Sequence, residues 1–227
     1  GGSDITGAIL ANGIDAAKYE NWTDVSGMLM ADPRIVENPL PIEYVSYREI
    51  RELAYSGASV LHDESIAPCR AKKIPINIRN TNAPEDNGTW IVESTCQKSK
   101  YVITGIAGKK GFCSINIEKD MLHNERGIGR KILEVVENEN MITEHLPSGI
   151  DTISVVISGN IDETKKQRML DTLNNTVHPD TMTFEDGFAI IAVAGRGMVK
   201  AKGTAARIFK ACADSDINIR MIDQGSS

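Results

Sequence analysis

The first residues of the chain can hold an anion. Gly1 and Gly2 allow a close approach of the backbone, and Ser3 and Asp4 then lead into a predicted helix that begins at Ile5. These residues either cap the helix or, with the helix amides behind them, hold an anion or orient its partner, because helix N-terminal amides favour negative charge. These residues alone leave both interpretations open.

A second group of residues could bind a free amino acid. Gly127 precedes a predicted helix at 130–139, so that backbone amides can approach a ligand carboxylate. Glu144 and Asp151 offer carboxylates to ammonium groups, and lysine, which has two such groups, needs both of them. Alternatively, Gly127 only begins a helix and Glu144 is a solvated strand residue. Four neighbours complete the candidate site: Met121, Ile128, Gly129 and Thr143.

This second group lies in a unit that occurs twice. A run of strand character from Gly111 leads through a polar loop to a helix, and the same order recurs 76 positions later without a gap. A tandem duplication explains this periodicity. Arg220 replaces Glu144 in the second copy, which disfavours an ammonium site there and favours a role in packing and dimerisation. The matching pairs are Gly111 and Gly187, Phe112 and Phe188, Gly127 and Gly203, Ile132 and Ile208, and Gly149 and Gly225.

Alternating and helical patterns predict the elements that position these residues. In the first part they are a strand at 19–24, a helix after the capping-box pattern of Ser46 and Glu49, a helix at 64–72, and strands at 74–78 and 89–92. After a polar linker at 93–100 they are strands at 101–106, 113–117 and 152–157, and helices at 130–139 and around Leu170. Helices on one face of an antiparallel sheet in this order give the ferredoxin-like plan.

Composition and charge limit the classes of partner and location. The chain has 227 residues, of which 41% are hydrophobic and 25% charged, so two or three compact globular units are expected. A net charge of −6 argues against a nucleic-acid or anionic-membrane partner. Since no membrane-spanning run or signal-peptide pattern occurs, a cytoplasmic location is expected. Cys69, Cys96, Cys113 and Cys212 form no CxxC pair, so neither a metal site nor a disulfide is predicted.

Five motifs occur in order before and around these elements. They are Gly-Gly-Ser-Asp at 1–4, Trp-Thr-Asp-Val at 22–25, Ala-Asp-Pro-Arg at 31–34, Gly-Ala-Ser-Val-Leu-His at 57–62 and Arg-Asn-Thr at 79–81. Together with the duplicated half they resemble the aspartokinases. The resemblance implies the C-terminal, nucleotide-binding part of an α/β amino-acid-kinase domain at 1–96. It further implies an α+β half of two ferredoxin-like (βαββαβ) ACT domains, at 97–182 and, truncated, at 183–227.

The resemblance also assigns roles to single residues. It implies that Ser3 and Asp4 lie at the phosphoryl-transfer and aspartate site, and that Thr23 and Asp24 contact the adenosine part of ATP. It places Arg34 near the phosphates, where a guanidinium can bind two oxygens, although an Asp-Pro-Arg loop is often only a turn with a solvated charge.

Two positions of the implied ATP site depart from the family pattern. Leu29 stands where many members have Tyr, and Ser59 stands where they have Lys, which implies a weaker grip on the nucleotide or other contacts. His62 is expected to be structural. The Lys-Phe-Gly-Gly-Thr stretch with which the family opens has no counterpart, and the hairpin partner strand after Gly225 is lacking. Residues 1–227 alone are therefore expected to have no kinase activity.

The parent enzyme implied by this resemblance uses ATP and Mg²⁺ to phosphorylate the β-carboxylate of L-aspartate, the first step of lysine, threonine and methionine biosynthesis. The loop that begins at Met121 resembles that of lysine-sensitive, monofunctional members. L-Lysine is thus the preferred feedback inhibitor, with L-threonine as the other choice, bound at the interfaces of a homodimer formed through the ACT domains, which could assemble further into a tetramer. Two alternatives stay open: a non-catalytic, amino-acid-binding regulatory module, and a fused aspartokinase and homoserine dehydrogenase.

Overall fold

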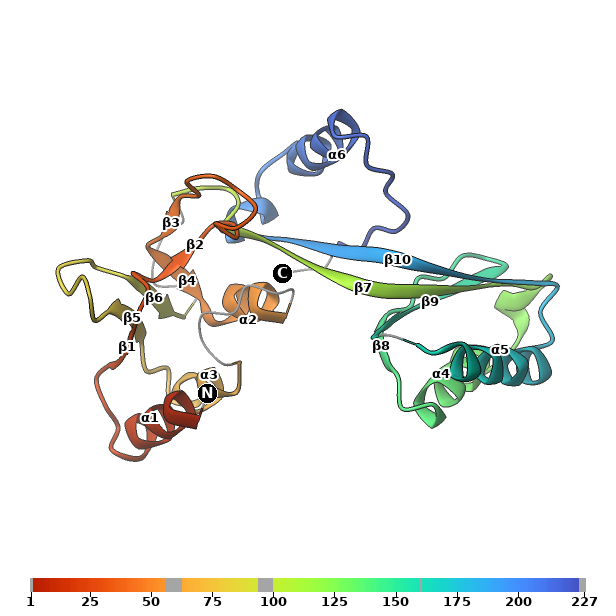
Figure 1. The fold of residues 1–227 in the computed structure, drawn as a ribbon, viewed down its shortest axis with the longest axis horizontal. Coiled ribbons are helices and arrows are strands. Elements are labelled where there is room, and N and C mark those ends of the chain that lie inside the picture. The colour runs from red at the N-terminus through yellow and green to blue at the C-terminus, as the bar shows by residue number, and fades with distance from the viewer. Residues whose placement is uncertain (1, 56–62, 94–99, 160, 225–227) are drawn as a thin grey trace. The chain divides into compact units, whose positions relative to one another are not determined.

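The computed structural model describes residues 2–55, 63–93, 100–159 and 161–224 (Figure 1). They form two compact units. The first unit comprises 1–109 together with 191–219, and the second comprises 110–190 together with 220–224. The chain thus leaves the first unit, builds most of the second, and then returns to the first.

The first unit contains a four-stranded sheet in the order β1 (Tyr19–Thr23), β5 (Ile76–Asn80), β6 (Thr89–Val92) and β4 (Tyr44–Ser46). β1 and β5 run parallel, with Thr23 opposite Asn80, whereas β5 and β6 run antiparallel and β4 and β6 parallel. The strand predicted at 74–78 lies at 76–80, because Lys73 turns the chain with a φ of 57° first. β2 (Met28–Leu29) and β3 (Pro41–Ile42) form a separate antiparallel pair.

The helices of this unit follow from local signals. α1 (Gly2–Gly13) begins at Gly2, so Ser3 and Asp4 lie in its first turn and do not precede it as caps. α2 (Tyr47–Tyr55) begins with the predicted capping box: Glu49 N donates to Ser46 Oγ (3.1 Å), and Ser46 N donates to the Glu49 carboxylate (2.9 Å). α3 (Asp63–Ala71) packs against α1. The largest fully buried side chains of the unit are Met28, Ile50, Leu53, Ile76, Ile78 and Ile91.

The second unit is built on a sheet in the order β10 (Thr181–Ala194), β7 (Gly105–Glu118), β9 (Thr152–Ser158) and β8 (Ile142–His145). β9 runs antiparallel to both β7 and β8. α4 (Ile128–Asn138) and α5 (Glu163–Val177) pack together, and their apolar stripes share one core with the sheet. The chain order β7, α4, β8, β9, α5, β10 confirms the predicted ferredoxin-like plan.

The strands predicted at 101–106 and 113–117 are wrong as separate elements. A single strand of 14 residues, β7, runs from Gly105 to Glu118, and residues 101–104 precede it without being part of a strand. Gly111 lies inside β7 with a φ of 91°. A glycine in this conformation kinks or bulges a strand without ending it, so the polar break in the sequence does not become a loop.

The duplication appears again in the coordinates. β7 and β10 each have 14 residues, and α4 and α6 (Thr204–Asp214) each have 11, at the same offset of 76 positions. The paired glycines that precede the helices, Gly127 and Gly203, have φ values of 75° and 81°. The two helices differ in burial: α4 buries four residues, whereas α6 buries only Thr204.

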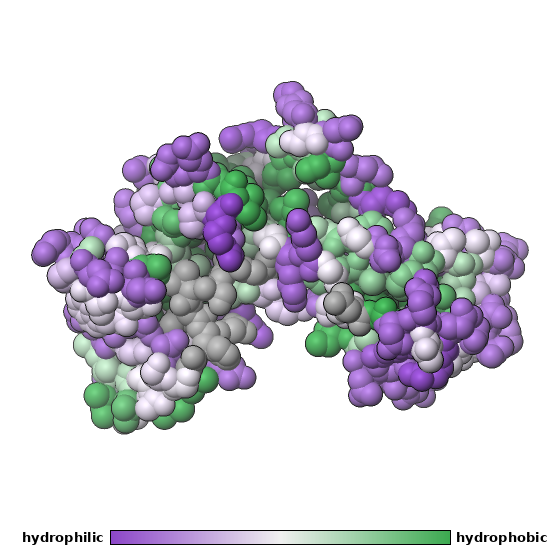
Figure 2. Space-filling model, viewed as in Figure 1, coloured by the Kyte–Doolittle hydropathy of each residue, from purple (hydrophilic) through white to green (hydrophobic). Residues whose placement is uncertain are grey.

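The surface over α1 carries hydrophobic side chains (Figure 2). Ile9, Leu10 and Ile14 have exposed fractions of 56%, 62% and 76%. Among the helices in the described ranges, none has the length and hydropathy needed to cross a membrane. Cys69 and Cys113 are buried and Cys212 is half-buried, and none of these three forms a disulfide, while Cys96 lies outside the described residues.

Candidate functional site

The first turn of α1 is held against β1 by polar contacts. Asn21 Nδ2 donates to Asp4 Oδ1 (3.3 Å), and Tyr19 Oη donates to the backbone oxygen of Asp4 (3.3 Å). Ser3 is exposed, and its Oγ lies 3.5 Å from Asp4 Oδ1. Gly7 permits this packing, because a Cβ there would lie 2.6 Å from Tyr19 Oη. Burial, opposed by the Asn21 hydrogen bond and reinforced by the charge of Asp4, raises the pKa of Tyr19. The two predicted catalytic residues, Ser3 and Asp4, therefore lie side by side, and Asn21 of β1 orients the Asp4 carboxylate.

Thr23 and Asp24 lie where β1 ends. Thr23 Oγ1 donates to Asp24 Oδ1 (3.2 Å). The backbone oxygen of Thr23 accepts from Thr81 N (2.8 Å) and Thr81 Oγ1 (3.0 Å), which ties the end of β1 to that of β5. In open α/β sheets, ligands bind outside the carboxyl ends of the parallel strands. The predicted adenosine contacts thus lie at the edge where this rule expects a ligand.

The structure adds polar residues at this edge that the motifs alone did not assign. Asn80 Nδ2 donates to Ser26 Oγ (2.9 Å), and Ser26 Oγ donates to Asp86 Oδ2 (2.5 Å). Trp22 of β1 is opposite Arg79 of β5, and the Arg79 guanidinium lies over the Trp22 ring, 5.0 Å from its centroid. The Arg-Asn-Thr motif at 79–81 directly after an apolar strand was the available signal for them.

Arg34 has a partner within its own loop. Its Nε and Nη2 donate to the Asp32 carboxylate at 2.7 to 3.1 Å, and its backbone N also donates to Asp32 Oδ1 (2.9 Å). These hydrogen bonds lower the pKa of Asp32. The Arg34 side chain is 84% exposed, so it is oriented by Asp32 and still accessible. No contact within the described ranges joins it to Thr23 or Asp24. Leu29 on β2 is 37% exposed, and Ser59 and His62 lie outside the described residues.

The start of α4 forms the second candidate site. Gly127 precedes the helix in the left-handed region, and no side chain caps the helix amides. A Cβ added at Gly127 or Gly129 would meet no atom within 4 Å, so the backbone faces open space there. Ile128 is buried, whereas Met121, which directly precedes the 3-10 helix η1 (Leu122–Asn124), is 55% exposed. This arrangement leaves helix N-terminal amides accessible to a carboxylate.

Asp151 belongs to this loop end of the sheet. Its backbone oxygen accepts from Lys119 N (3.0 Å), and its Oδ1 lies 3.5 Å from His123 Nδ1. Both partners flank Met121 in the chain. Asp151 thus lies beside the loop that leads to Gly127, in agreement with a shared site.

Glu144 lies elsewhere on the sheet. Thr143 pairs with Ile157 and His145 pairs with Val156, so Glu144 is the extra residue of a β-bulge, a feature that often redirects a side chain. At about 3.3 Å per residue, the five steps from Asp151 to Val156 correspond to roughly 16 Å along the sheet. A single copy of the chain therefore does not bring Glu144 and Asp151 together around one small ligand.

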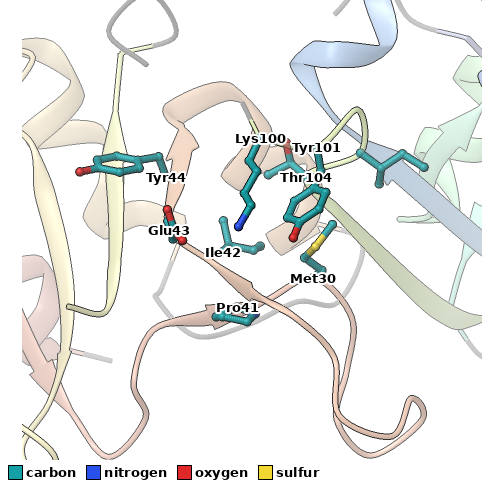
Figure 3. A pocket seen from close by; sticks show the side chains of 9 residues that line it. Met30, Pro41, Ile42, Glu43, Tyr44, Lys100, Tyr101 and Thr104 are labelled. Carbon is teal, nitrogen blue, oxygen red and sulfur yellow. The ribbon is translucent and has the colours of Figure 1, made fainter. Parts of the chain in front are cut away.

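A hollow of about 70 Å³ lies between β3, β4 and the residues before β7. Figure 3 shows Lys100 extending into it between Glu43 and Tyr101. Since about 10 to 15 Å³ of this kind of volume holds one water, the hollow has room for only a few waters. It contains none of the predicted site residues: its lining is Met30, Pro41, Ile42, Glu43, Tyr44, Lys100, Tyr101, Ile103 and Thr104. In the described part of the chain, no group of three His, Cys, Asp or Glu residues is placed to hold a metal ion.

Comparison with family models and curated proteins adds independent information. The model of the amino acid kinase family matches residues 1–80, and a model described as ACT domain matches residues 191–227. Aspartokinase 3 of Bacillus subtilis (strain 168) is 42% identical over 227 residues, which are 100% of this chain and 50% of that protein. The chain spans about half the length, or less, of the first curated relatives that it matches.

Solved structures give the same match. The aspartate kinase of Clostridium acetobutylicum, described as an allosteric enzyme, has a TM-score of 0.93 and 50% identity over 99% of this chain and 52% of its own. E. coli aspartokinase III in complex with aspartate and ADP (R-state) has a TM-score of 0.80 and 26% identity, over 100% of this chain and 50% of its own. The same E. coli protein in complex with lysine and aspartate (T-state) has a TM-score of 0.75.

Proposed function

We propose that this chain, which is similar to aspartokinases along its whole length, forms the nucleotide-binding and regulatory parts of a feedback-regulated aspartokinase. Such an enzyme transfers the γ-phosphate of ATP to the β-carboxylate of L-aspartate. One observation carries the proposal: the predicted substrate-binding residues lie in the first turn of α1 and at the carboxyl ends of β1 and β5. The whole of this chain is 42% identical to an aspartokinase. The domain boundaries at 96/97 and 182/183 belong to the same proposal.

The chemistry needs an anion cradle and a held nucleotide more than covalent help from the protein. The amides of α1 and the Ser3 hydroxyl bind a carboxylate of the substrate, and Asp4, held by Asn21, orients the substrate through its ammonium group. Thr23 and Asp24 bind the adenosine part of ATP. Arg34, oriented by Asp32, binds phosphate oxygens. Mg²⁺ enters with the ATP, since kinases hold this ion through substrate phosphates and one or two carboxylates.

Regulation acts through the first copy of the duplicated unit. L-Lysine is the effector, with its carboxylate at the amides behind Gly127 and one ammonium group at Asp151. Since the bulge at Glu144 is distant from Asp151 within a chain, the second ammonium group binds Glu144 of another copy. This requires a homodimer through the ACT units, from which a tetramer can form. The E. coli relative was solved with lysine, which supports this choice of effector. A cytoplasmic location without nucleic-acid or membrane partners accompanies this function.

Aspartyl phosphate provides a direct test, because hydroxylamine displaces its phosphate to give a hydroxamate, which forms a coloured complex with iron(III). The protein from the complete gene is expected to form hydroxamate from ATP, Mg²⁺ and aspartate, and residues 1–227 alone to form none. Asp4→Asn is expected to lower kcat by roughly 100-fold, the scale of a misplaced substrate. Asp15→Asn, two residues after the end of α1, is the matched control.

Failure has a clear form. If the complete protein binds lysine but forms no hydroxamate with any preparation of ATP and aspartate, the chain is a non-catalytic amino-acid sensor. Hydroxamate formed by residues 1–227 alone would show that the chain contains the whole active site, contrary to the proposal.

A further inference from the structure

The carboxylate of Glu49 is the centre of a buried polar cluster. Glu49 lies on α2 and is 6% exposed. Its oxygens accept from Ser46 N (2.9 Å) and Ser46 Oγ (2.6 Å), from Thr104 Oγ1 (2.5 Å), and from Arg196 N (3.0 Å). The Arg196 Nε lies 2.9 Å from Glu49 Oε2. One carboxylate thus joins three segments of the first unit.

This cluster exceeds what a helix cap requires. A capping-box glutamate needs only the backbone N–H of the cap residue, and such a glutamate is commonly solvated. Here Thr104 and Arg196 enclose the remaining oxygen surface, and the Arg196 side chain is 18% exposed. A buried charge is tolerated when an opposite charge is paired with it, and Arg196 provides that charge for Glu49.

Glycines on both sides of Arg196 bring its backbone against residues 102–104. A Cβ at Gly195 would lie 2.3 Å from Val102 O, and a Cβ at Gly197 would lie 2.6 Å from Val102 Cα. Thr104 N donates to Ala194 O (2.8 Å) at the same place. Any larger residue at 195 or 197 would separate these segments and withdraw Arg196 from Glu49.

The partners belong to different functional parts of the chain. Glu49 lies within the match to the amino acid kinase family, and Arg196 lies within the ACT match. Arg196 begins the 3-10 helix η2 (Arg196–Val199), seven residues before Gly203, which precedes α6. Gly203 is the second-copy counterpart of Gly127, so η2 lies just before the helix of the second copy.

We propose that the Arg196–Glu49 pair is a regulatory relay. Through it, the second copy of the duplicated unit controls the stability of the helix α2 in the kinase part. Arg196 is a positioning residue that acts through Glu49 on the N-terminus of α2. The relay rests on the proposed function, because it gives the second copy, which has no effector site, a role in feedback inhibition.

Hydrogen exchange tests the link without reference to activity. Arg196→Met keeps most of the side-chain volume and removes the charge. In the complete protein it is expected to speed exchange of the α2 amides, Tyr47–Tyr55, about tenfold, a shift within the usual range of coupling between sites. Gly195→Ala is expected to speed the exchange of the α2 amides as well, because the added Cβ displaces Arg196 from Glu49. Arg196→Lys keeps the charge, so its α2 amides are expected to be better protected than those of Arg196→Met.

Arg168→Met is the matched control, because Arg168 makes an ion pair with Glu139 and its side chain is 59% exposed. It is expected to leave α2 unchanged. Unchanged α2 exchange in a folded Arg196→Met protein would overturn the relay.

Inhibition by lysine tests the regulatory part. Arg196→Met is expected to raise the lysine concentration for half-inhibition about tenfold, while kcat/KM without lysine stays within about twofold of the wild-type value. An inhibition curve that superimposes on that of the wild type would also overturn the relay. If the wild-type protein forms no hydroxamate, the proposed function fails, and the exchange experiment still decides whether Arg196 controls α2.

Discussion

Gly111 and Gly187 occupy the same place in two 14-residue strands and share the left-handed conformation, with φ values of 91° and 78°. Neither faces an atom within 4 Å of an added Cβ. The glycines are therefore required by their backbone angles and not by crowding. A duplicated sequence has kept the same local conformation in both copies, although the two copies differ in what covers their helices.

Alanine at these positions measures the backbone requirement directly. Gly111→Ala and Gly187→Ala are each expected to lower the free energy of unfolding by about 1 to 2 kcal/mol, the cost of left-handed angles for a residue with a Cβ. Gly129→Ala, inside α4 and equally uncrowded, is expected to be neutral or stabilising by up to about 1 kcal/mol. Urea unfolding measures all three. Equal effects of the three substitutions would contradict the assignment.

Arg34 is expected to act on ATP through an orientation set by Asp32. Arg34→Met removes charge-assisted hydrogen bonds to phosphate and is expected to raise the KM for ATP by roughly 10- to 100-fold in the complete protein. Asp32→Asn, which leaves Arg34 present but less well oriented, is expected to have a smaller effect of the same kind. Steady-state hydroxamate formation at varied ATP gives both values. If neither substitution changes the KM for ATP, Arg34 is only a solvated loop residue.

Glu144 and Asp151 should affect lysine binding separately. Glu144→Gln and Asp151→Asn each remove one acceptor for an ammonium group, and each is expected to weaken binding by roughly 10-fold or more, the scale of a charged hydrogen bond. Asp186→Asn, on the exposed face of β10, is the control. Isothermal titration calorimetry of the dimer measures the affinities. If a monomeric variant binds lysine as tightly as the dimer, the shared site is wrong.

Stability should depend on the ionisation of Glu49. Burial alone would raise the pKa of Glu49, but hydrogen bonds from Ser46, Thr104 and Arg196 outweigh it and lower the pKa below its ordinary value. A lowered pKa in the folded state adds stability above the unfolded pKa, and this stability is lost as the pH falls through the folded value. The free energy of unfolding should therefore fall less between pH 7 and acid in Glu49→Gln than in the wild type.

Denaturant unfolding across this pH range provides the measurement. Glu137→Gln, at an exposed position of α4, is the control. A wild-type pH dependence retained in full by Glu49→Gln would show that other carboxylates determine it.

Local patterns allowed much of the fold to be predicted from the sequence. The capping box at Ser46 and Glu49 involves residues three apart, so spacing alone predicted the start of α2. The repeat predicted α6 from α4, because one sequence pattern specifies both. The break predicted between 106 and 113 was wrong because a glycine inside a strand resembles a glycine in a turn when its partner strand is unknown.

Sites that depend on distant partners could not be predicted in the same way. Glu144 and Asp151 are close in sequence, but they lie at different positions along the sheet, where each residue of an extended strand adds about 3.3 Å. The resemblance implied that Arg34 binds phosphate, but it did not indicate that the Asp32 carboxylate orients the Arg34 guanidinium. Arg196 showed no signal at all, because its partner lies on another element and no motif records the contact.

The separation of Glu49 from Arg196 by 147 residues has a consequence for synthesis. All of 110–190, the main part of the second unit, leaves the ribosome between them. At typical rates of synthesis, Glu49 spends roughly 7 to 30 s in the nascent chain before Arg196 exists. During that interval α2 has its capping box and the packing of Ile50 and Leu53, but it lacks the charge of Arg196 that compensates Glu49.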